Sequence, residues 1–163
     1  MMSDAAFSFI PDEDVRRRLL PSLERISKAY GQLFSGYALN AEGVLNETLR
    51  VENYPGTVTV ENISFYTMCE HHFLPFFGQA SVMYRPRHVI TGLGKIVRLV
   101  RDVHARRLQI QEIMARDICQ DMMRVLDAEG CRVTLRARHL CICSRGPDDD
   151  TSITEVVYEE GNL

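Results

Sequence analysis

Hydrophobic residues in the first third of the chain recur mostly at helical spacing. From Pro21 to about Phe34 the apolar positions repeat every three to four residues, with proline suited to a first helical turn. A shorter helix is expected over residues 41–49. Residues 1–12 show no periodicity and are expected to form a loose arm.

The pattern then changes to one that is typical of strands. Residues 57–68 and 79–84 are rich in β-branched and aromatic side chains. We expect them to form an antiparallel pair, joined through residues 69–72 and a turn at Pro75 and Gly78.

The second half of the chain predicts two helices followed by two strands. Residues 96–103 carry one apolar helical face, and a longer helix is expected from about 108 to 127. Residues 131–144 alternate in the manner of a long strand, and 152–158 form a last short one. The resulting ββααββ order predicts an α+β domain, with a four-stranded antiparallel sheet covered by two helices on one face. The bare face and the sheet edges require a partner, so we expect a homo-oligomer.

Two short segments carry metal-binding residue types. Cys69 and His72 are three residues apart, and Cys141 lies near the other end of the chain. Two thiolates and one imidazole suit Zn²⁺, and three protein ligands leave one position open, as in catalytic zinc sites. In a strand, His139 and Cys141 would share one face, but Cys143 would share it too and is the alternative third ligand.

Two histidines beside this cluster remain for proton transfer. Zn²⁺ lowers the pKa of a bound water to about 7, which makes hydroxide available at neutral pH. His71 and His139 would then lie where a proton must be delivered. Together these residues predict a hydrolase.

Size and composition fit one domain that works in a reducing compartment. The chain has 163 residues, 45% hydrophobic and 25% charged, which is enough for a core of its own. No apolar stretch approaches the ~20 residues that span a bilayer, and no signal peptide is evident, so we expect a cytoplasmic protein without a membrane partner. Five scattered cysteines favour metal binding and packing over disulfides.

Charge is distributed unevenly along the chain. The net charge of −3 does not indicate a nucleic-acid partner. Basic residues gather between Lys95 and Arg107, whereas the stretch from Asp148 to Glu160 is acidic. The middle of the chain is therefore the expected anion-binding region.

Four blocks of sequence, in this order, resemble the GTP cyclohydrolase I family. They are FYTMCEHHFLPFFG (65–78), GLGKIVR (92–98), ARRLQIQE (105–112) and HLC (139–141) with Arg145 and Gly146 after it. The resemblance covers about Pro21 to Gly146. It implies a tunnelling fold (T-fold), in which subunits join their sheets into barrels, usually as a decamer with active sites between subunits. Residues 57–163 would form this catalytic domain, and residues 1–56 an N-terminal arm with helices.

The family resemblance also implies an activity. It implies zinc-dependent hydrolysis of the guanine imidazole ring of GTP at C8, which releases formate and gives 7,8-dihydroneopterin triphosphate, an early step towards pterin or folate cofactors. The substrate would be a guanine nucleotide, and no cofactor other than Zn²⁺ is implied.

Roles for individual residues follow from the same resemblance. It places zinc on Cys69, His72 and Cys141, and acid–base chemistry on His71 and His139. Glu112 would accept hydrogen bonds from the guanine N1–H and 2-amino group, a task that suits an acceptor-only carboxylate. The remaining substrate-binding positions are Gln111, Lys95, Arg98, Arg145 and Arg25. His88 and His104 match no motif and are expected on the surface.

Two departures from the family pattern leave alternatives open. Gly94 stands where the family usually has serine, and Asp148 to Asp150 replace residues that are typically basic. One alternative is a divergent paralogue that takes a guanine nucleotide with fewer phosphates or a modified purine and stops before the sugar rearrangement. The other is a non-catalytic homologue that binds nucleotide.

Overall fold

The computed structural model describes residues 7–52 and 54–163, in two compact units, Met1–Leu33 and Phe34–Leu163. The described part of the first unit consists of α1 (Glu13–Leu19), a 3₁₀ turn (Leu20–Ser22) and α2 (Leu23–Leu33). α2 confirms the helix predicted after Pro21. The pattern gave no sign of α1 because it buries no residue; Asp12 begins it by accepting hydrogen bonds from the backbone N–H groups of Asp14 and Val15.

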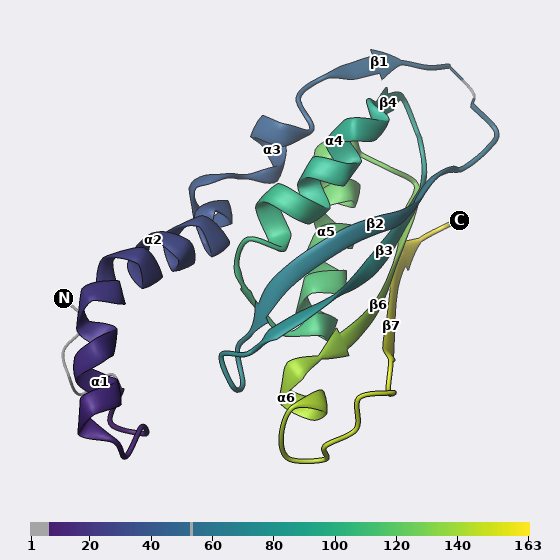
Figure 1. The fold of residues 1–163 in the computed structure, drawn as a ribbon. Coiled ribbons are helices and arrows are strands. Elements are labelled where there is room, and N and C mark those ends of the chain that lie inside the picture. The colour runs from purple at the N-terminus through teal and green to yellow at the C-terminus, as the bar shows by residue number, and fades with distance from the viewer. Residues whose placement is uncertain (1–6, 53) are drawn as a thin grey trace. The chain divides into compact units, whose positions relative to one another are not determined.

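A five-stranded sheet organises the second unit, with strand order β5-β2-β3-β6-β7 (Figure 1). Its members are β2 (Val58–Cys69), β3 (Pro75–Arg85), β6 (Gly130–His139), β7 (Thr154–Gly161) and the two-residue β5 (Leu108–Gln109). The four long strands are antiparallel, as predicted, and β5 adds a short parallel edge beside β2. The α+β class and the ββααββ order are therefore confirmed.

Helices cover one face of this sheet. α4 (Leu93–Arg98) continues as a π-helical segment (Leu99–His104), and α5 (Gln111–Leu126) packs against β6 and β7. Figure 1 shows α4 and α5 on the same side of the strands. Between them and the sheet lies the core, which includes Phe65, Phe76, Val82, Tyr84, Ile96, Leu99, Met114, Ile118, Met122, Val133 and Leu135.

Four predicted boundaries are wrong, each for a local reason. Pro75 and Gly78 lie inside β3, and the chain turns earlier, over 70–74. Residues 108–109 pair with β2, so α5 begins at Gln111. The helix expected over 41–49 is a single turn, α3 (Ala41–Val44), followed by β1 (Thr48–Arg50), which pairs with β4 (Val89–Thr91).

The fourth correction concerns the segment that carries Cys141. The strand expected over 131–144 ends at His139, and α6 (Leu140–Cys143) forms one helical turn. The Ser144 hydroxyl donates to the Leu140 carbonyl, which helps to close this turn. Strand alternation therefore does not extend to Cys141 or Cys143.

Gly78 allows β3 and β6 to approach closely. A Cβ at this position would lie 1.9 Å from the carbonyl oxygen of Arg136, a distance that no side chain can occupy. Glycine is thus required by the close pairing of β3 with β6, and not by a turn.

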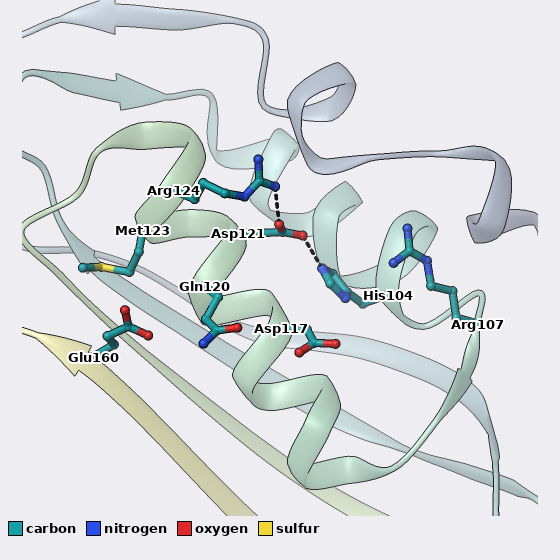
Figure 2. Close-up of a pocket in the computed structure, with 8 residues that line it drawn as sticks. All are labelled: His104, Arg107, Asp117, Gln120, Asp121, Met123, Arg124 and Glu160. Carbon is teal, nitrogen blue, oxygen red and sulfur yellow. Dashed lines mark hydrogen bonds and ion pairs between the residues drawn. The ribbon is translucent and has the colours of Figure 1, made fainter.

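His104 is buried, contrary to the prediction that it lies on the surface, whereas His88 is exposed as expected. The Nε2 atom of His104 lies 3.0 Å from the Asp121 carboxylate, and Asp121 also pairs with Arg124 at 2.6 Å (Figure 2). Arg124 reaches on to Glu42 of α3. His104, Asp121 and Arg124 line a cavity of about 580 Å³. Together with Glu42 they tie the π-helical segment, α5 and α3 to one another, which is a structural role.

No helix in the described ranges 7–52 and 54–163 has the length and apolar character needed to cross a bilayer.

Candidate functional site

Cys69 and His72 are positioned by the turn between β2 and β3. Cys69 is the last residue of β2; its backbone N–H donates to the Leu74 carbonyl at 2.8 Å, and its own carbonyl accepts from the Phe73 N–H at 2.9 Å. Phe73 adopts a left-handed backbone conformation with φ of 56°, which is rare for a bulky residue and closes the turn. The Glu70 N–H binds the Gln109 carbonyl of β5, which holds the turn from the other side.

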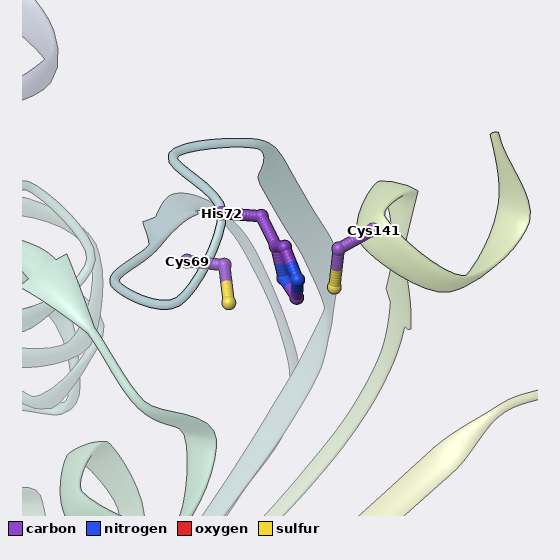
Figure 3. A group of neighbouring side chains, drawn as sticks. All are labelled: Cys69, His72 and Cys141. Carbon is purple, nitrogen blue, oxygen red and sulfur yellow. The ribbon is translucent and has the colours of Figure 1, made fainter. Parts of the chain in front are cut away.

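The single turn of α6 brings Cys141 to the same place. The ligand atoms of Cys69, His72 and Cys141 all lie within 4.8 Å of one another, and Figure 3 shows both sulfurs and the imidazole pointing into a common space. Cys143 is absent from every metal-binding group found among the described residues. In a helix, side chains two positions apart in the sequence point in directions that differ by about 200°. Cys143 therefore cannot point in the same direction as Cys141.

The donor set fits a soft divalent cation. Burial and the neighbouring Cys69 raise the pKa of the Cys141 thiol, because two thiolates this close repel each other when no cation compensates them. A bound divalent metal would reverse that effect and hold both sulfurs as thiolates. The three residues can therefore bind a metal ion.

His139, the last residue of β6, lies beside this group with its ring fixed on two sides. The ring stacks on Phe76 with centroids 4.4 Å apart and planes inclined by 3°. Its Nε2 lies 2.7 Å from Gln111 Oε1, and its Nδ1 lies 3.9 Å from Cys141 Sγ. Burial lowers the pKa of His139; Glu112 opposes this effect and His71 adds to it.

Gln111 was predicted to bind substrate, but its side chain is 3% exposed and engaged by protein groups. Its amide nitrogen donates to the Leu135 carbonyl at 2.9 Å, and its oxygen accepts from the Thr154 hydroxyl at 2.6 Å. Its contact with substrate stays a prediction.

A cavity of about 440 Å³ opens beside the metal-binding group and collects most of the predicted site. It is lined by Cys69, His71, His72, Ile110, Gln111, Glu112, His139, Cys141, Ile142, Thr154, Glu155 and Val156. His71 is exposed, with Nδ1 3.9 Å from Cys69 Sγ. Arg145 approaches the group from outside, with a guanidinium nitrogen 3.4 Å from His72 Nε2.

Glu112 lies in the first turn of α5, exposed at the cavity wall. A glutamate is favourable at this place, because the unpaired backbone N–H groups of the first helical turn carry partial positive charge. Ile110, Ile142 and Val156 supply apolar wall around these polar groups. An apolar cavity with a few converging polar groups is typical of small-molecule sites.

None of the four predicted phosphate-binding cations lines this cavity, and apart from Arg145 none contacts the metal-binding group in the described structure. Lys95 on α4 pairs with Glu47 at 3.2 Å and donates to Asn46 at 3.3 Å. Arg98 is exposed at the end of α4, and Arg25 is exposed on α2 of the first unit. Within a single described chain, the residues that line the cavity include none of these three.

The two departures noted in the sequence have clear structural settings. Gly94 is exposed, and a Cβ there would meet no atom within 4 Å, so packing does not exclude a serine. Asp149 uses its carboxylate to hold its own loop, accepting from the backbone N–H and the hydroxyl of Thr151 and from the Ser152 hydroxyl. None of Asp148, Asp149 and Asp150 is among the described residues that line the cavity.

Thr154 and Phe76 were not identified from the sequence. Their positions depend on strand register: Phe76 pairs with His139, and Thr154 pairs with Ala137. Neither residue type signals chemistry by itself, so only a correct register could have indicated them.

Comparison with known proteins gives a consistent result. The family model described as GTP cyclohydrolase I matches residues 4–163. GTP cyclohydrolase 1 of Campylobacter jejuni strain RM1221 is 45% identical over 85% of this chain and 73% of its own length, and that of Parabacteroides distasonis is 46% identical over 87% and 73%. The enzyme of Chlorobaculum tepidum is 39% identical over 99% of this chain and 73% of its own length.

A solved structure supports the fold. The apo crystal structure of the archaeosine synthase QueF-Like superimposes with a TM-score of 0.53 at 18% identity, covering 68% of this chain and 99% of the other. At that identity the likeness concerns the fold alone.

Proposed function

The chain belongs to the GTP cyclohydrolase I family, and we propose that the cavity beside Cys69, His72 and Cys141 is where it opens the imidazole ring of GTP. Its activity is that of a GTP cyclohydrolase I, which hydrolyses the ring at C8, releases formate and gives 7,8-dihydroneopterin triphosphate. One observation carries the placement: the metal-binding group lies on the wall of the same cavity as two histidines and a glutamate.

The metal in this site is proposed to be zinc. Two cysteines and one histidine are the donors that zinc prefers, and they leave one coordination position for water. When bound, zinc would lower the pKa of that water and so supply hydroxide at neutral pH. The chain itself holds the three donors on two turns that are stabilised by hydrogen bonds, the β2–β3 turn and α6. Apolar side chains of the cavity wall surround them.

His71 and His139 are proposed to move protons during the reaction. The exposed His71 lies beside Cys69 and can exchange protons with solvent, which suits delivery to the purine N7. The partly buried His139 is held rigidly by Phe76 and Gln111, which suits repeated transfers at the ribose ring oxygen. Burial favours its neutral form, which can accept a proton.

Glu112 is proposed to select guanine. A carboxylate accepts two parallel hydrogen bonds, and guanine presents two adjacent donors at N1 and the 2-amino group. Glu112 lies at the cavity wall with no side-chain hydrogen bond or ion pair recorded within the described chain, so the carboxylate is available to a ligand.

Phosphate recognition is proposed to require a second subunit. Arg145 contacts His72 at the edge of the metal-binding group, but none of Arg145, Lys95, Arg98 and Arg25 is among the described residues that line the cavity. A homo-oligomer whose sheets join into a barrel, with a decamer as the family arrangement, would let one subunit supply cations to its neighbour's cavity. The exposed alternate positions of β7, at the sheet edge, are compatible with such strand pairing.

The activity is tested by supplying GTP to purified zinc-loaded protein and measuring formate and pterin fluorescence together. We expect both products in equal amounts. Formate without fluorescence would indicate a reaction that stops after ring opening. Nucleotide binding with neither product would indicate a non-catalytic homologue. If formate appears without fluorescence, the variant Gly94→Ser, whose side chain meets no clash, would show whether a hydroxyl at this position completes the reaction.

A further inference from the structure

We propose that Thr154 and Gln111 act as positioning residues that hold His139 in a single neutral tautomer, with its proton on Nε2 and with Nδ1 unprotonated on the side of Cys141. The consequence for turnover rests on the proposed function, but the hydrogen-bond arrangement is a property of the fold. It gives Gln111 a role other than direct substrate contact.

The orientation of the Gln111 amide is set by two backbone carbonyls. Its nitrogen lies 2.9 Å from the Leu135 oxygen and 3.4 Å from the Thr154 oxygen. Only an NH₂ group can satisfy two carbonyl acceptors, so the opposite orientation would place oxygen against oxygen. The side-chain oxygen of Gln111 must therefore face Thr154 Oγ1 and His139.

The Thr154 hydroxyl strengthens this assignment from the other side. Its oxygen lies 2.6 Å from Gln111 Oε1 and 3.1 Å from the Ala137 carbonyl oxygen. The hydroxyl has one proton, and the shorter contact is that to Gln111. Gln111 Oε1 thus accepts from Thr154 and has its other lone pair left for His139.

These contacts determine which nitrogen of neutral His139 carries the proton. At 2.7 Å from an oxygen that can only accept, Nε2 must donate. Nδ1 is then the unprotonated nitrogen, and it lies 3.9 Å from Cys141 Sγ, on the side of the metal-binding group. Stacking on Phe76 restricts rotation of the ring, so Nδ1 is the atom presented for proton transfer.

The preceding loop helps to place Thr154. Thr154 is the first residue of β7 and pairs with Ala137. Asp149 ties Thr151 and Ser152 just before the strand begins, so the hydroxyl enters the cavity wall at a defined register. This gives the acidic segment a local structural role.

The test compares Thr154→Val, which keeps the shape but removes the hydroxyl, with Thr154→Ser, which restores it. Thr59→Val serves as the matched control, because Thr59 is an exposed strand residue at the end of β2 opposite Cys69. Protein labelled with ¹⁵N only in its five histidines is examined by solid-state NMR at a pH of about 8, well above the ordinary histidine pKa of about 6.5. His139→Gln identifies the His139 signals by their disappearance.

In wild-type protein we expect Nε2 of His139 to be protonated and Nδ1 bare. In Thr154→Val a methyl group cannot stay at the 2.6 Å that separates the hydroxyl from Gln111 Oε1, so the amide oxygen should shift away from His139. The variant should therefore give a mixture of tautomers and lower kcat for GTP about ten- to a hundredfold, the usual effect of losing a supporting hydrogen bond. KM and zinc content should stay near wild type, Thr154→Ser should recover most of kcat, and Thr59→Val should match wild type.

A single unchanged tautomer in Thr154→Val, or an unchanged kcat, would overturn the proposal. A loss of kcat that serine does not rescue would overturn it as well, because the hydroxyl would then not be the cause. Failure of the wild-type protein to turn over GTP would overturn the proposed function instead, and the NMR comparison alone would then decide the positioning role.

Discussion

His139 and Phe76 are opposite partners in the pairing of β6 with β3, and their rings lie face to face. Phe76 is fully buried in the core, so the orientation of the histidine is tied directly to the packing of the sheet. Stacking on Phe76 restricts the plane of the imidazole ring, and the contact of Gln111 with Nε2 restricts the rotation of the ring within that plane.

This relationship predicts that Phe76→Leu impairs catalysis beyond its effect on stability. The free energy of unfolding should fall by about 1–2 kcal/mol, since a buried ring and its stacking are lost. In addition, kcat for GTP should fall with little change in KM. Phe65→Leu is the matched control: Phe65 is buried in the same core and contacts Phe76 edge-on. Equal losses of kcat in the two variants would contradict a specific role for stacking.

Glu112→Ala should weaken guanine recognition without affecting the metal. The expected result is a rise in KM for GTP of at least tenfold, because a charged double hydrogen bond is worth about 1.5–3 kcal/mol. Zinc content, measured by elemental analysis, should stay at wild-type level. Glu129→Ala, which removes an exposed carboxylate beyond the other end of α5, should leave KM unchanged. A zinc-free Glu112→Ala protein would show that the carboxylate serves the metal.

Asp121 should make stability depend on pH. Burial raises the pKa of its carboxyl, but the hydrogen bonds from His104 and Arg124 outweigh burial and lower it. A pKa lowered by folding stabilises the protein above the unfolded value of about 3.9, and this contribution is lost as the pH falls through the folded pKa.

Asp121→Asn should therefore reduce the free energy of unfolding by about 1–2 kcal/mol at neutral pH. The difference from wild type should shrink when denaturant unfolding is repeated below a pH of about 4. Asp117→Asn, at a more exposed position on the same helix, should change stability by less than about 0.5 kcal/mol. A difference between Asp121→Asn and wild type that stays constant with pH would contradict the assignment.

Mixed oligomers should recover activity if neighbouring subunits share a site. Cys141→Ala and Lys95→Ala should each be inactive alone. After dissociation and joint reassembly, about a quarter of the sites should combine an intact cavity with an intact lysine. A mixture of Cys141→Ala with His139→Gln should stay inactive, because both changes affect the same cavity. No recovery in the first mixture would place Lys95 and the cavity in one subunit.

The sequence was sufficient for the sheet and for the metal-binding group, but not for the turns that place it. Alternation and helical spacing reflect which side chains are buried, so they indicated the four long strands and α5 correctly. The end of β6 at His139 is decided by the hydrogen bonds of α6, which leave no periodic signal. The strand argument for Cys141 as a ligand is therefore wrong, whereas the family motif named the same residue, and its thiol lies within 4.8 Å of the ligand atoms of Cys69 and His72.

The surroundings of the site depended on contacts between distant segments. Thr154, Gln111 and Phe76 meet His139 only because three strands and a helix are brought together in one register. Residue type alone cannot indicate such contacts, since threonine and phenylalanine are common in strands. Likewise, Lys95 was grouped with the cavity by its motif, whereas its contacts lie with Asn46 and Glu47.

Zinc titration of the metal-free protein, followed by formate release from GTP, tests the central claim most directly. The wild-type protein should gain activity in proportion to zinc until one ion is bound per chain. Cys143→Ala should behave in the same way, and Cys141→Ala should neither retain zinc nor release formate. Formate release by metal-free wild-type protein, or full activity in Cys141→Ala, would contradict the account.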